Sequence, residues 1–446
     1  MNGTPDKRKS KPVFIRGLEE LENKAEFAEL AGDEFPHRKS LLEVDRRSVL
    51  KLMGAASALA GLGGCRSLIL PQKKVVPFVK QPEDAVSGKT TQYATVYNLN
   101  GFGIGVLATA HDSRPTKLEG NPNHPSSLGG LDAQTMAQVV SLYDPDRLQL
   151  PKFKGEPTSW SDALAALRGA LSESKNGAGF YLLTETVGSP TLAKQVQDFL
   201  KVYPAATWVQ WEPANRDNAR EGLKTAFGQD VHVAYDLAKA DVIVSLDSDF
   251  LYSGPGAVRY ARDTMARRKP GHPDGYNRIY AFESNRTTAG VVADHRARVK
   301  ASGIARLAGL LASRLGVAGA TGGEVAGVDA KLIDALVKDL NASRGKSAVI
   351  VGDHQPPEAH ALAAAINEHL GNVGTTVHVL EPVLAKPTNQ GAEFAALLQA
   401  MGTGEAKTLL VLGGNPVYSA YGDTKFADLL AKVPLSATLS LYNDET

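Results

Sequence analysis

Three short segments of the chain carry residue types that can bind a phosphate group. They are DSDFLYSGPG at 247–256, GDHQPPEAH at 352–360 and GGNPVYS at 413–419. Each follows a short apolar stretch and precedes a helical pattern, where free backbone N–H groups can hold an anion. The same residues are typical of strand-exit turns and helix N-caps, and the residues alone favour that structural interpretation. The candidate binding residues are Asp247, Asp249, Gly352, Asp353, Gly413, Gly414, Asn415 and Pro416.

Catalytic and metal-binding motifs with a recognisable spacing do not occur in the sequence. Its 10 histidines are scattered, and there is no H-E-x-x-H, G-x-S-x-G or phosphate-loop pattern. The single cysteine, Cys65, lies near the N-terminus. A body without a further thiol excludes disulfides, cysteine-ligated zinc and an iron–sulfur cluster of its own. We therefore expect no catalytic residue and no metal ligand set in this portion.

Residues 45–65, DRRSVLKLMGAASALAGLGGC, combine paired arginines, a short apolar run and a cysteine. The apolar run at 52–64 is shorter than the roughly 20 residues that span a bilayer. A basic segment before a short apolar run that ends in small residues is typical of a secretory signal. Arg46 and Arg47 indicate the twin-arginine export route. The alternative is a buried helix with a basic N-terminal end.

Cys65 follows an aliphatic residue and two small residues, Leu62, Gly63 and Gly64, in a pattern that resembles a bacterial lipobox. In that interpretation Cys65 is acylated, becomes the mature N-terminus and attaches the protein to a membrane. One acyl chain binds membranes only marginally, so stable anchoring requires further chains or a protein partner. The alternative is an ordinary or uncleaved export signal that contains a cysteine.

Length and charge narrow the class of protein. The chain has 446 residues, 43% of them apolar, and a net charge of +1. This length accommodates two or three domains. The near-zero net charge argues against a nucleic-acid-binding protein.

The pattern of apolar residues predicts the elements that would position the candidate residues. Strands at 92–98, 103–110 and 115–119 and a helix at 131–143 indicate a small β-rich domain. From about 158 onward, short apolar strands alternate with amphipathic helices, which predicts doubly wound parallel sheets covered by helices on both faces. The expected strands are 179–184, 206–211, 241–247, 278–283, 347–352, 376–381, 407–414 and 435–442, and the expected helices are 190–202, 215–226, 256–268, 302–315, 328–342, 357–370, 390–401 and 423–432.

We expect an α/β protein in five parts. They are a leader at 1–65, a linker at 66–90, a β-rich first domain at 91–157, a nucleotide-binding-like α/β domain at 158–318 and a second α/β domain at 319–446. The chain stops just after a strand, where the loops of a doubly wound sheet carry function. We therefore expect the last domain to be truncated at residue 446.

Several of these segments resemble one enzyme family. RPTKLEGNPNHPSSLGGLDAQTMAQVVSLYDPDRLQLP at 114–151 resembles the first domain of the molybdopterin-guanine-dinucleotide oxidoreductases, the dimethyl sulfoxide reductase family. DLAKADVIVSLDSDFL at 236–251 and LLVLGGNPVYS at 409–419 resemble its nucleotide-binding domains. The resemblance covers roughly residues 90–446 and implies the fold of that family: a small β-rich domain followed by two doubly wound units.

Two departures from the family pattern concern its cofactors. Active members carry cysteine ligands for an iron–sulfur cluster, but residues 131–135 read LDAQT and lack both the last cysteine and the lysine that follows it. Active members also present a side chain to molybdenum, in a loop that here reads WEPANRDNAREG at 211–222. Asp217 is its one conceivable ligand, flanked by Arg216 and Arg220, and a surface aspartate at a helix start explains it better. The resemblance therefore implies that molybdopterin is lost.

The leader EFPHRKSLLEVDRRSVLKLMG at 34–54 is similar to that of a narrower group, extended twin-arginine-signal proteins that fuse a molybdopterin-type domain to an iron–sulfur domain. The group includes the large electron-transfer subunit of alternative complex III, a quinol-oxidising respiratory complex. The resemblance implies a non-catalytic scaffold on the periplasmic side of the bacterial cytoplasmic membrane. It implies partners that are polytopic quinol-binding and haem c subunits, and iron–sulfur clusters in a C-terminal domain beyond residue 446.

Two alternatives stay open. One is an active molybdenum-dependent oxidoreductase, such as a polysulfide or thiosulfate reductase, with Asp217 on the metal. The other is a lipid-anchored protein that binds a nucleotide-like ligand. Molybdenum content separates the first alternative from the scaffold, and co-purification with membrane partners separates the second.

Overall fold

The computed structural model describes Lys51, Val86 and residues 88–446. Nearly all of this lies in the second of two compact units, residues 77–446. The export signal predicted at Arg46 and Arg47 and the lipid attachment point predicted at Cys65 lie outside the described residues. Within the described part, no helix combines the length and apolar character needed to cross a membrane.

A three-stranded antiparallel sheet opens the described chain, as the sequence predicts. Its strands are adjacent in sequence order: β1 (Thr90–Leu99), β2 (Phe102–His111) and β3 (Arg114–Gly120). Asn100 and Gly101 both have positive φ, the geometry of a tight two-residue hairpin turn. Helix α5 (Ala133–Ser141) follows, and the Asp132 side chain caps it by accepting a hydrogen bond from the Thr135 backbone N–H at 2.7 Å.

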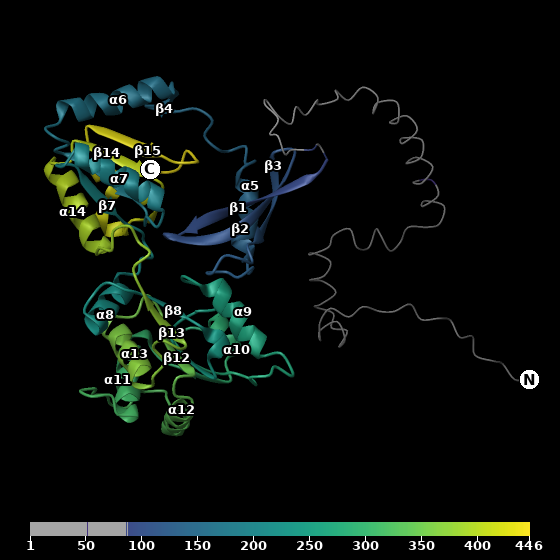
Figure 1. The fold of residues 1–446 in the computed structure, drawn as a ribbon. Coiled ribbons are helices and arrows are strands. Elements are labelled where there is room, and N and C mark those ends of the chain that lie inside the picture. The colour runs from purple at the N-terminus through teal and green to yellow at the C-terminus, as the bar shows by residue number, and fades with distance from the viewer. Residues whose placement is uncertain (1–50, 52–85, 87) are drawn as a thin grey trace, which may run out of the picture. The chain divides into compact units, whose positions relative to one another are not determined.

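A first parallel sheet has the order β15–β14–β6–β7. Its strands are β6 (Phe180–Thr184), β7 (Thr207–Gln210), β14 (Thr408–Leu412) and β15 (Leu435–Leu439). Helix α7 (Pro190–Val202) joins β6 to β7, and α14 (Gln390–Thr403) leads into β14 (Figure 1). Two short helices, α15 (Pro416–Ser419) and α16 (Phe426–Leu430), join β14 to β15.

A second parallel sheet has the order β11–β10–β9–β12. Its strands are β9 (Val242–Leu246), β10 (Arg278–Glu283), β11 (His295–Arg298) and β12 (Ser347–Val351). The helices around it are α9 (Ala257–Arg267), α10 (Thr288–Val292), α11 (Ile304–Leu315), α12 (Ala330–Ala342) and α13 (Pro357–His369).

Helices cover both faces of each sheet, which confirms the predicted doubly wound class. In the second sheet, Val242, Val244 and Leu246 of β9 pack with α11, α12 and α13, while Ile243 faces the core beside α9 and α10. In the first sheet, alternate residues of β6 likewise contribute to two separate cores. A strand buried on both faces reads as a continuous apolar run, the pattern that identified it in the sequence.

The boundary predicted at 318/319 does not coincide with the sheets. β6 of the first predicted domain pairs with β14 of the second, so that β7 and β15 lie in the same sheet, and β12 pairs with β9 across the boundary. The second sheet is thus inserted between two halves of the first. The chain passes outward through α8 (Asp217–Phe227) and β8 (His232–Tyr235) and returns through β13 (Val377–Leu380), which pairs antiparallel with β8.

Other differences from the predicted elements are local. The strand expected at 376–381 lies in the β8–β13 ribbon rather than in a parallel sheet. The helix expected at 423–432 is a 3₁₀ turn at Gly422–Thr424 followed by α16. Several elements were not predicted. They include strands β8 and β11, the short helices α10 and α15, the hairpin of β4 (Lys152–Phe153) and β5 (Glu156–Pro157), and helix α6 (Trp160–Glu173), none of whose residues is buried.

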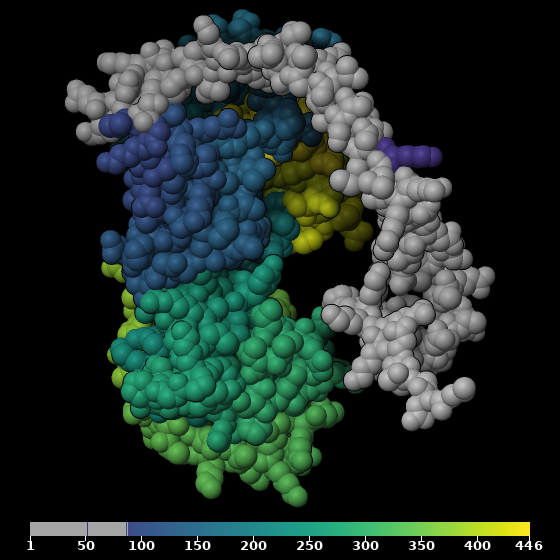
Figure 2. Space-filling view, turned by 90° about the vertical axis from the view of Figure 1, so that its right-hand side faces the viewer, coloured from purple at the N-terminus to yellow at the C-terminus, as the bar shows by residue number. Residues whose placement is uncertain are grey.

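The β-rich segment contacts the region of the second sheet. Arg259 of α9 donates a hydrogen bond to the Pro125 carbonyl oxygen at 3.2 Å. The rings of Phe102 and His232 lie 5.4 Å apart, centroid to centroid. In the space-filling view the blue surface of the β-rich segment adjoins the teal surface of the second-sheet region (Figure 2).

Candidate functional site: the two strand-exit crevices

Both parallel sheets have the same topology around one central strand. β6 has β7 on one side and β14 on the other, and β9 has β10 on one side and β12 on the other. The strand order therefore reverses between β6 and β14 and between β9 and β12. In open α/β sheets, ligands bind outside the carboxyl ends of the strands at such a reversal. The two exits, β9/β12 and β6/β14, are the candidate sites of this protein.

The β9/β12 exit brings together two of the three predicted segments. Asp247 follows β9, and Gly352 and Asp353 follow β12. A Cβ atom added to Gly352 would lie 2.0 Å from the Asp247 carbonyl oxygen, so only glycine permits this approach of the two exits. The third segment, 413–419, lies at the β6/β14 exit of the other sheet.

The Asp247 carboxylate is buried, with 5% of the residue exposed, and both of its oxygens accept hydrogen bonds. Oδ1 accepts from the Ser284 backbone N–H at 2.9 Å and from its hydroxyl at 3.1 Å. Oδ2 pairs with His354 Nε2 at 2.9 Å and accepts from Gln355 Nε2 at 2.8 Å. Burial alone would raise the pKa of Asp247, but the hydrogen bonds from Ser284 and His354 together hold it below its ordinary value.

The other two aspartates of this exit are also engaged within the protein. Asp249 accepts a hydrogen bond from the Ala289 backbone N–H at 3.1 Å, at the start of α10, and contacts the Thr288 hydroxyl. Asp353 accepts a hydrogen bond from Arg216 Nε at 3.0 Å. All three carboxylates predicted here as possible ligand-binding groups therefore have protein partners.

The β6/β14 exit has a different composition. Gly413 and Gly414 follow β14 with positive φ, and the side chain of Glu185, which follows β6, lies against both. Asn415 accepts a hydrogen bond from the Thr446 backbone N–H at 3.1 Å, and Pro416 is the buried first residue of α15. The glycines thus face a carboxylate rather than a cationic side chain.

Two carboxylates at this exit have raised pKa values. Solvent reaches the Glu185 side chain, yet the surrounding protein desolvates it and raises its pKa. Glu212, which is 8% exposed, has its pKa raised chiefly by burial and further by the charge of Glu185, although its Oε1 accepts a hydrogen bond from the Thr186 backbone N–H at 3.3 Å. Among the described residues, neither glutamate forms an ion pair with a lysine or arginine.

Asp217 begins helix α8 and serves the packing of the chain. Its Oδ2 accepts a hydrogen bond from the Gly391 backbone N–H at 3.0 Å, in the first turn of α14. Its Oδ1 lies 3.9 Å from the Arg220 guanidinium. Across residues 88–446, no group of three histidine, aspartate or glutamate side chains is placed to hold a metal ion.

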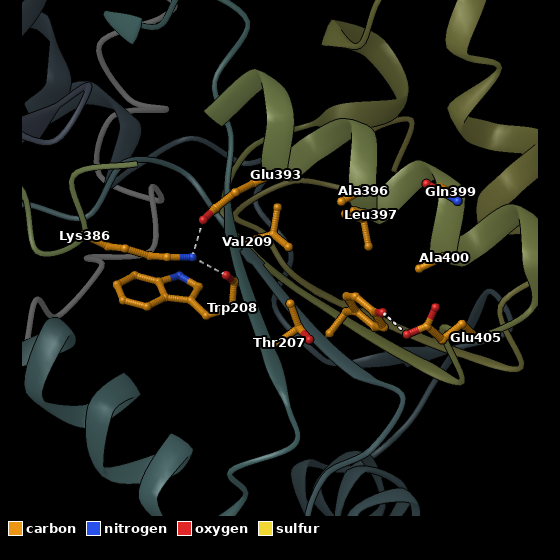
Figure 3. A pocket seen from close by; sticks show the side chains of 11 residues that line it. Thr207, Trp208, Val209, Lys386, Glu393, Ala396, Leu397, Gln399, Ala400 and Glu405 are labelled. Atoms are coloured by element: carbon orange, nitrogen blue, oxygen red, sulfur yellow. Dashed lines mark hydrogen bonds and ion pairs between the residues drawn. The ribbon is translucent and has the colours of Figure 1, made fainter. Parts of the chain in front are cut away.

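A pocket of ≈ 370 Å³ lies away from both exits, between β7 and α14 (Figure 3). Its charged groups pair with each other: Lys386 Nζ lies 2.5 Å from Glu393 Oε1 and donates to the Trp208 carbonyl oxygen at 2.6 Å. The Tyr181 hydroxyl donates to Glu405 at 3.1 Å. These contacts cover the free edge of β7 and so stabilise the sheet.

Residues that the sequence interpretation missed lie next to those it found. Ser284 follows β10 and Glu185 follows β6 directly, so the rule that selected Asp247, a polar residue at a strand exit, would also have selected them. His354 and Gln355 lie within the segment 352–360. What the sequence could not show is that β10 and β12 flank β9, which directs these side chains to one carboxylate.

The doubly wound sheets and the preceding β-rich segment define a molybdopterin-oxidoreductase-like fold. Acetylene hydratase from Pelobacter acetylenicus superposes with a TM-score of 0.51 over 78% of this chain and 58% of its own, at 12% identity. That identity supports similarity of fold alone.

Curated relatives point in the same direction. The chain is 28% identical to the "Menaquinone reductase, molybdopterin-binding-like subunit" of Nitratidesulfovibrio vulgaris, over 91% of this chain and 64% of that protein. It is 27% identical to a nitrate reductase of Klebsiella oxytoca over 46% of this chain, but only 24% of that enzyme. No protein-family model matches the chain. The resemblance to molybdopterin oxidoreductases inferred from the motifs is confirmed, for a chain that spans less than two thirds of these relatives.

The residues at the two exits do not fit a molybdopterin dinucleotide. Its pyrophosphate is anionic and is bound by N–H donors and cationic side chains. At the β6/β14 exit the charged side chain against the glycines is the Glu185 carboxylate, and at the β9/β12 exit Ser284, His354 and Gln355 donate to Asp247. Asp217, the one candidate metal ligand, is bound to Gly391.

Proposed function

We propose that this chain is a non-catalytic, molybdopterin-oxidoreductase-like scaffold in a membrane-attached complex that oxidises quinol, as in alternative complex III. The observation that carries the proposal is the donor set at the two exits: the fold is retained, but its ligand-binding positions hold carboxylates that are either unpaired or satisfied by the protein. Loss of the cofactor with retention of the fold is what a structural role predicts.

The name of one relative supports the link to a quinone-dependent complex, although not the direction of electron transfer. The Nitratidesulfovibrio vulgaris protein is described as a molybdopterin-binding-like subunit of a menaquinone reductase, and the match extends over 91% of this chain. In our proposal the partners are polytopic quinone-binding subunits and haem c subunits, as the resemblance to alternative complex III implies. Electrons pass through iron–sulfur clusters carried outside residues 1–446, because the sequence offers no thiolate ligands beyond Cys65.

The leader extends the proposal to location. Arg46 and Arg47 direct export of the folded protein, and acylated Cys65 holds it on the periplasmic side of the bacterial cytoplasmic membrane. Because one acyl chain is a weak anchor, the complex itself supplies most of the membrane attachment.

A molybdenum-dependent oxidoreductase is the second candidate, favoured by the nitrate reductase match over 46% of the chain. In that case Asp217 would have to exchange its hydrogen bond to Gly391 for a metal ion. The β6/β14 exit would also have to hold a pyrophosphate beside Glu185.

Purification from native membranes tests the scaffold proposal. The full protein, tagged at its C-terminus, is extracted in detergent, and the co-purifying subunits are identified by mass spectrometry and haem absorbance. We expect polytopic and haem-containing partners. A Cys65→Ala variant should retain those partners, while Arg46→Lys with Arg47→Lys should abolish export and assembly. A protein that is extracted alone, with no such partner, would overturn the proposal.

A further inference from the structure

The carboxylate of Asp247 is held in the way that proteins hold a bound oxyanion. It lies at the reversal of strand order in the second sheet, where a ligand is expected, and it is 5% exposed. Donors reach it from two neighbouring strand exits: Ser284 follows β10, and His354 and Gln355 follow β12. Backbone N–H, hydroxyl, imidazole and amide groups therefore converge on one pair of oxygens.

Gln355 contributes a buried amide donor to the same carboxylate, and its Nε2 also lies 3.1 Å from His354 Nε2. Gln355 is 1% exposed, and its Nε2 donates to Asp247 at 2.8 Å, while its buried Oε1 has no partner among the described residues. Turning the amide would place Oε1 against the carboxylate, and the two acceptors would repel each other. An unpaired buried acceptor is costly, so the hydrogen bond to the carboxylate must compensate for it.

The backbone conformation of Asp247 also differs from that of most residues with a side chain. Its φ is 53°, in the left-handed region, which aspartate adopts more readily than most residues with a Cβ atom but less readily than glycine. Glycine would adopt this conformation more easily, and glycine is what strand exits that approach a phosphate commonly use. The side chain is therefore kept at this position despite a conformational cost.

We propose that Ser284, His354 and Gln355 form an oxyanion-binding site at the β9/β12 exit whose resident anion is the carboxylate of Asp247 itself. The carboxylate keeps small anions, inorganic phosphate included, out of the position, and its removal opens a site for a small carboxylate such as acetate. This inference does not depend on the scaffold role, since it concerns only the residues of the exit.

Replacement of Asp247 by glycine, with acetate supplied in solution, tests the inference on the whole protein. Asp247→Gly removes the carboxylate and the strain of the positive φ, and leaves space that acetate fills, its methyl group standing where Cβ was. The midpoint of thermal unfolding is measured in acetate and in chloride at equal ionic strength. We expect acetate to raise the midpoint of D247G saturably by roughly 4 °C, and not that of the wild-type protein.

Glu185→Gly is the matched control. It removes a carboxylate from the equivalent position of the first sheet, where no described residue donates a hydrogen bond to it. Acetate should leave this variant unaffected relative to chloride. An acetate response of D247G no larger than that of E185G or of the wild type would overturn the inference.

A second pair of variants tests the inference if D247G does not fold. The His354 side chain is 62% exposed, so its replacement disturbs little packing. His354→Ala removes one donor to Asp247, whereas His354→Gln retains an N–H group at a similar reach. We expect H354A to lower the unfolding midpoint and H354Q to restore most of it. Equal midpoints for H354A and the wild type would contradict the proposed site.

Discussion

Asp247 and Glu185 occupy the same position in two sheets of the same topology, and their surroundings differ. Each follows the central strand at the point where strand order reverses. Asp247 is 5% exposed, receives hydrogen bonds from three residues and has a lowered pKa. Glu185 is exposed, has no donor among the described residues and has a raised pKa. One exit is closed by its own carboxylate, and the other presents a carboxylate to solvent.

The comparison shows that two strand exits of the same topology can surround a carboxylate with different groups. The strand order alone would mark both exits as binding sites. The β9/β12 exit has donors suited to an anion, but they are used within the protein. The β6/β14 exit has Gly413 and Gly414, but the Glu185 carboxylate lies beside them.

The largest difference in stability between variants of the two exits should appear when each carboxylate is replaced by an amide. Asp247→Asn places an NH₂ group against donors from Ser284, His354 or Gln355, whichever way the amide is turned. Hydrogen bonds to a charged group contribute about 1.5–3 kcal/mol each, so the loss should be about 3 kcal/mol in the free energy of unfolding at pH 7. Glu185→Gln is the control and should not destabilise the protein. Denaturant titration measures both, and an equal effect of the two substitutions would remove the distinction.

Replacing a glycine by alanine at each exit should give a smaller difference in the free energy of unfolding than the amide substitutions. In Gly352→Ala the new Cβ would lie 2.0 Å from the Asp247 carbonyl oxygen, a backbone atom, so β9 and β12 must separate. We expect a loss of about 2–3 kcal/mol. Gly413→Ala meets only the flexible Glu185 side chain at 3.1 Å, and its cost is the positive φ, about 1 kcal/mol. The reverse order, measured by denaturant titration, would contradict the close approach at β9/β12.

The stability contributed by the two carboxylates should depend on pH with opposite sign. The folded-state pKa of Asp247 lies below 3.8, so its interactions stabilise the protein above that pH and are lost as the pH falls through the folded-state value. The penalty of Asp247→Asn should therefore shrink in acid.

Glu185 should behave in the opposite way. Its folded-state pKa lies above 4.5, so the wild-type protein loses stability as the pH rises through that value. Glu185→Gln should give a small gain at pH 7 that disappears below pH 4.5. Thermal unfolding between pH 3 and 7 measures both variants, and a gain for Glu185→Gln that grows in acid would refute the assignment.

The Arg216–Asp353 ion pair should contribute least. Both side chains are about one-third exposed, and the distance between them is 3.0 Å. Pairs of this kind are screened by water and contribute about 0–1 kcal/mol. Asp353→Asn should lower the free energy of unfolding by less than 1 kcal/mol, an effect that 1 M salt abolishes in denaturant titration. A loss as large as that of Asp247→Asn would show that Asp353 stabilises the exit as much as Asp247 does.

The sequence predicted local features better than long-range ones. Period and composition identified strands such as 278–283 and helices such as 190–202 with the bounds that the structure has, because these features depend on neighbouring residues. The insertion of the second sheet into the first was missed, because adjacent strands were assumed to be neighbours in sequence. Helix α6 was missed although the sequence carries a helix-start signal, with Ser159 as the cap and Asp162 three residues later.

The candidate residues show the same limit. Asp247, Gly352 and Gly413 could be found because polar and glycine residues after apolar strands indicate strand exits. Whether such a carboxylate is satisfied by the protein depends on which strands are neighbours. Ser284 and His354 reach Asp247 only because β10 and β12 flank β9, and no local pattern in the sequence encodes that order.

The content of molybdenum and guanine nucleotide in the full protein, purified with its partners from native membranes, tests the scaffold role most directly. Elemental analysis gives molybdenum per chain, and acid extraction with mass spectrometry gives the nucleotide. We predict that both stay at the level of a control purified from cells that lack this protein. One equivalent of molybdenum together with extractable guanine nucleotide would contradict the scaffold role and establish the chain as part of a molybdenum enzyme.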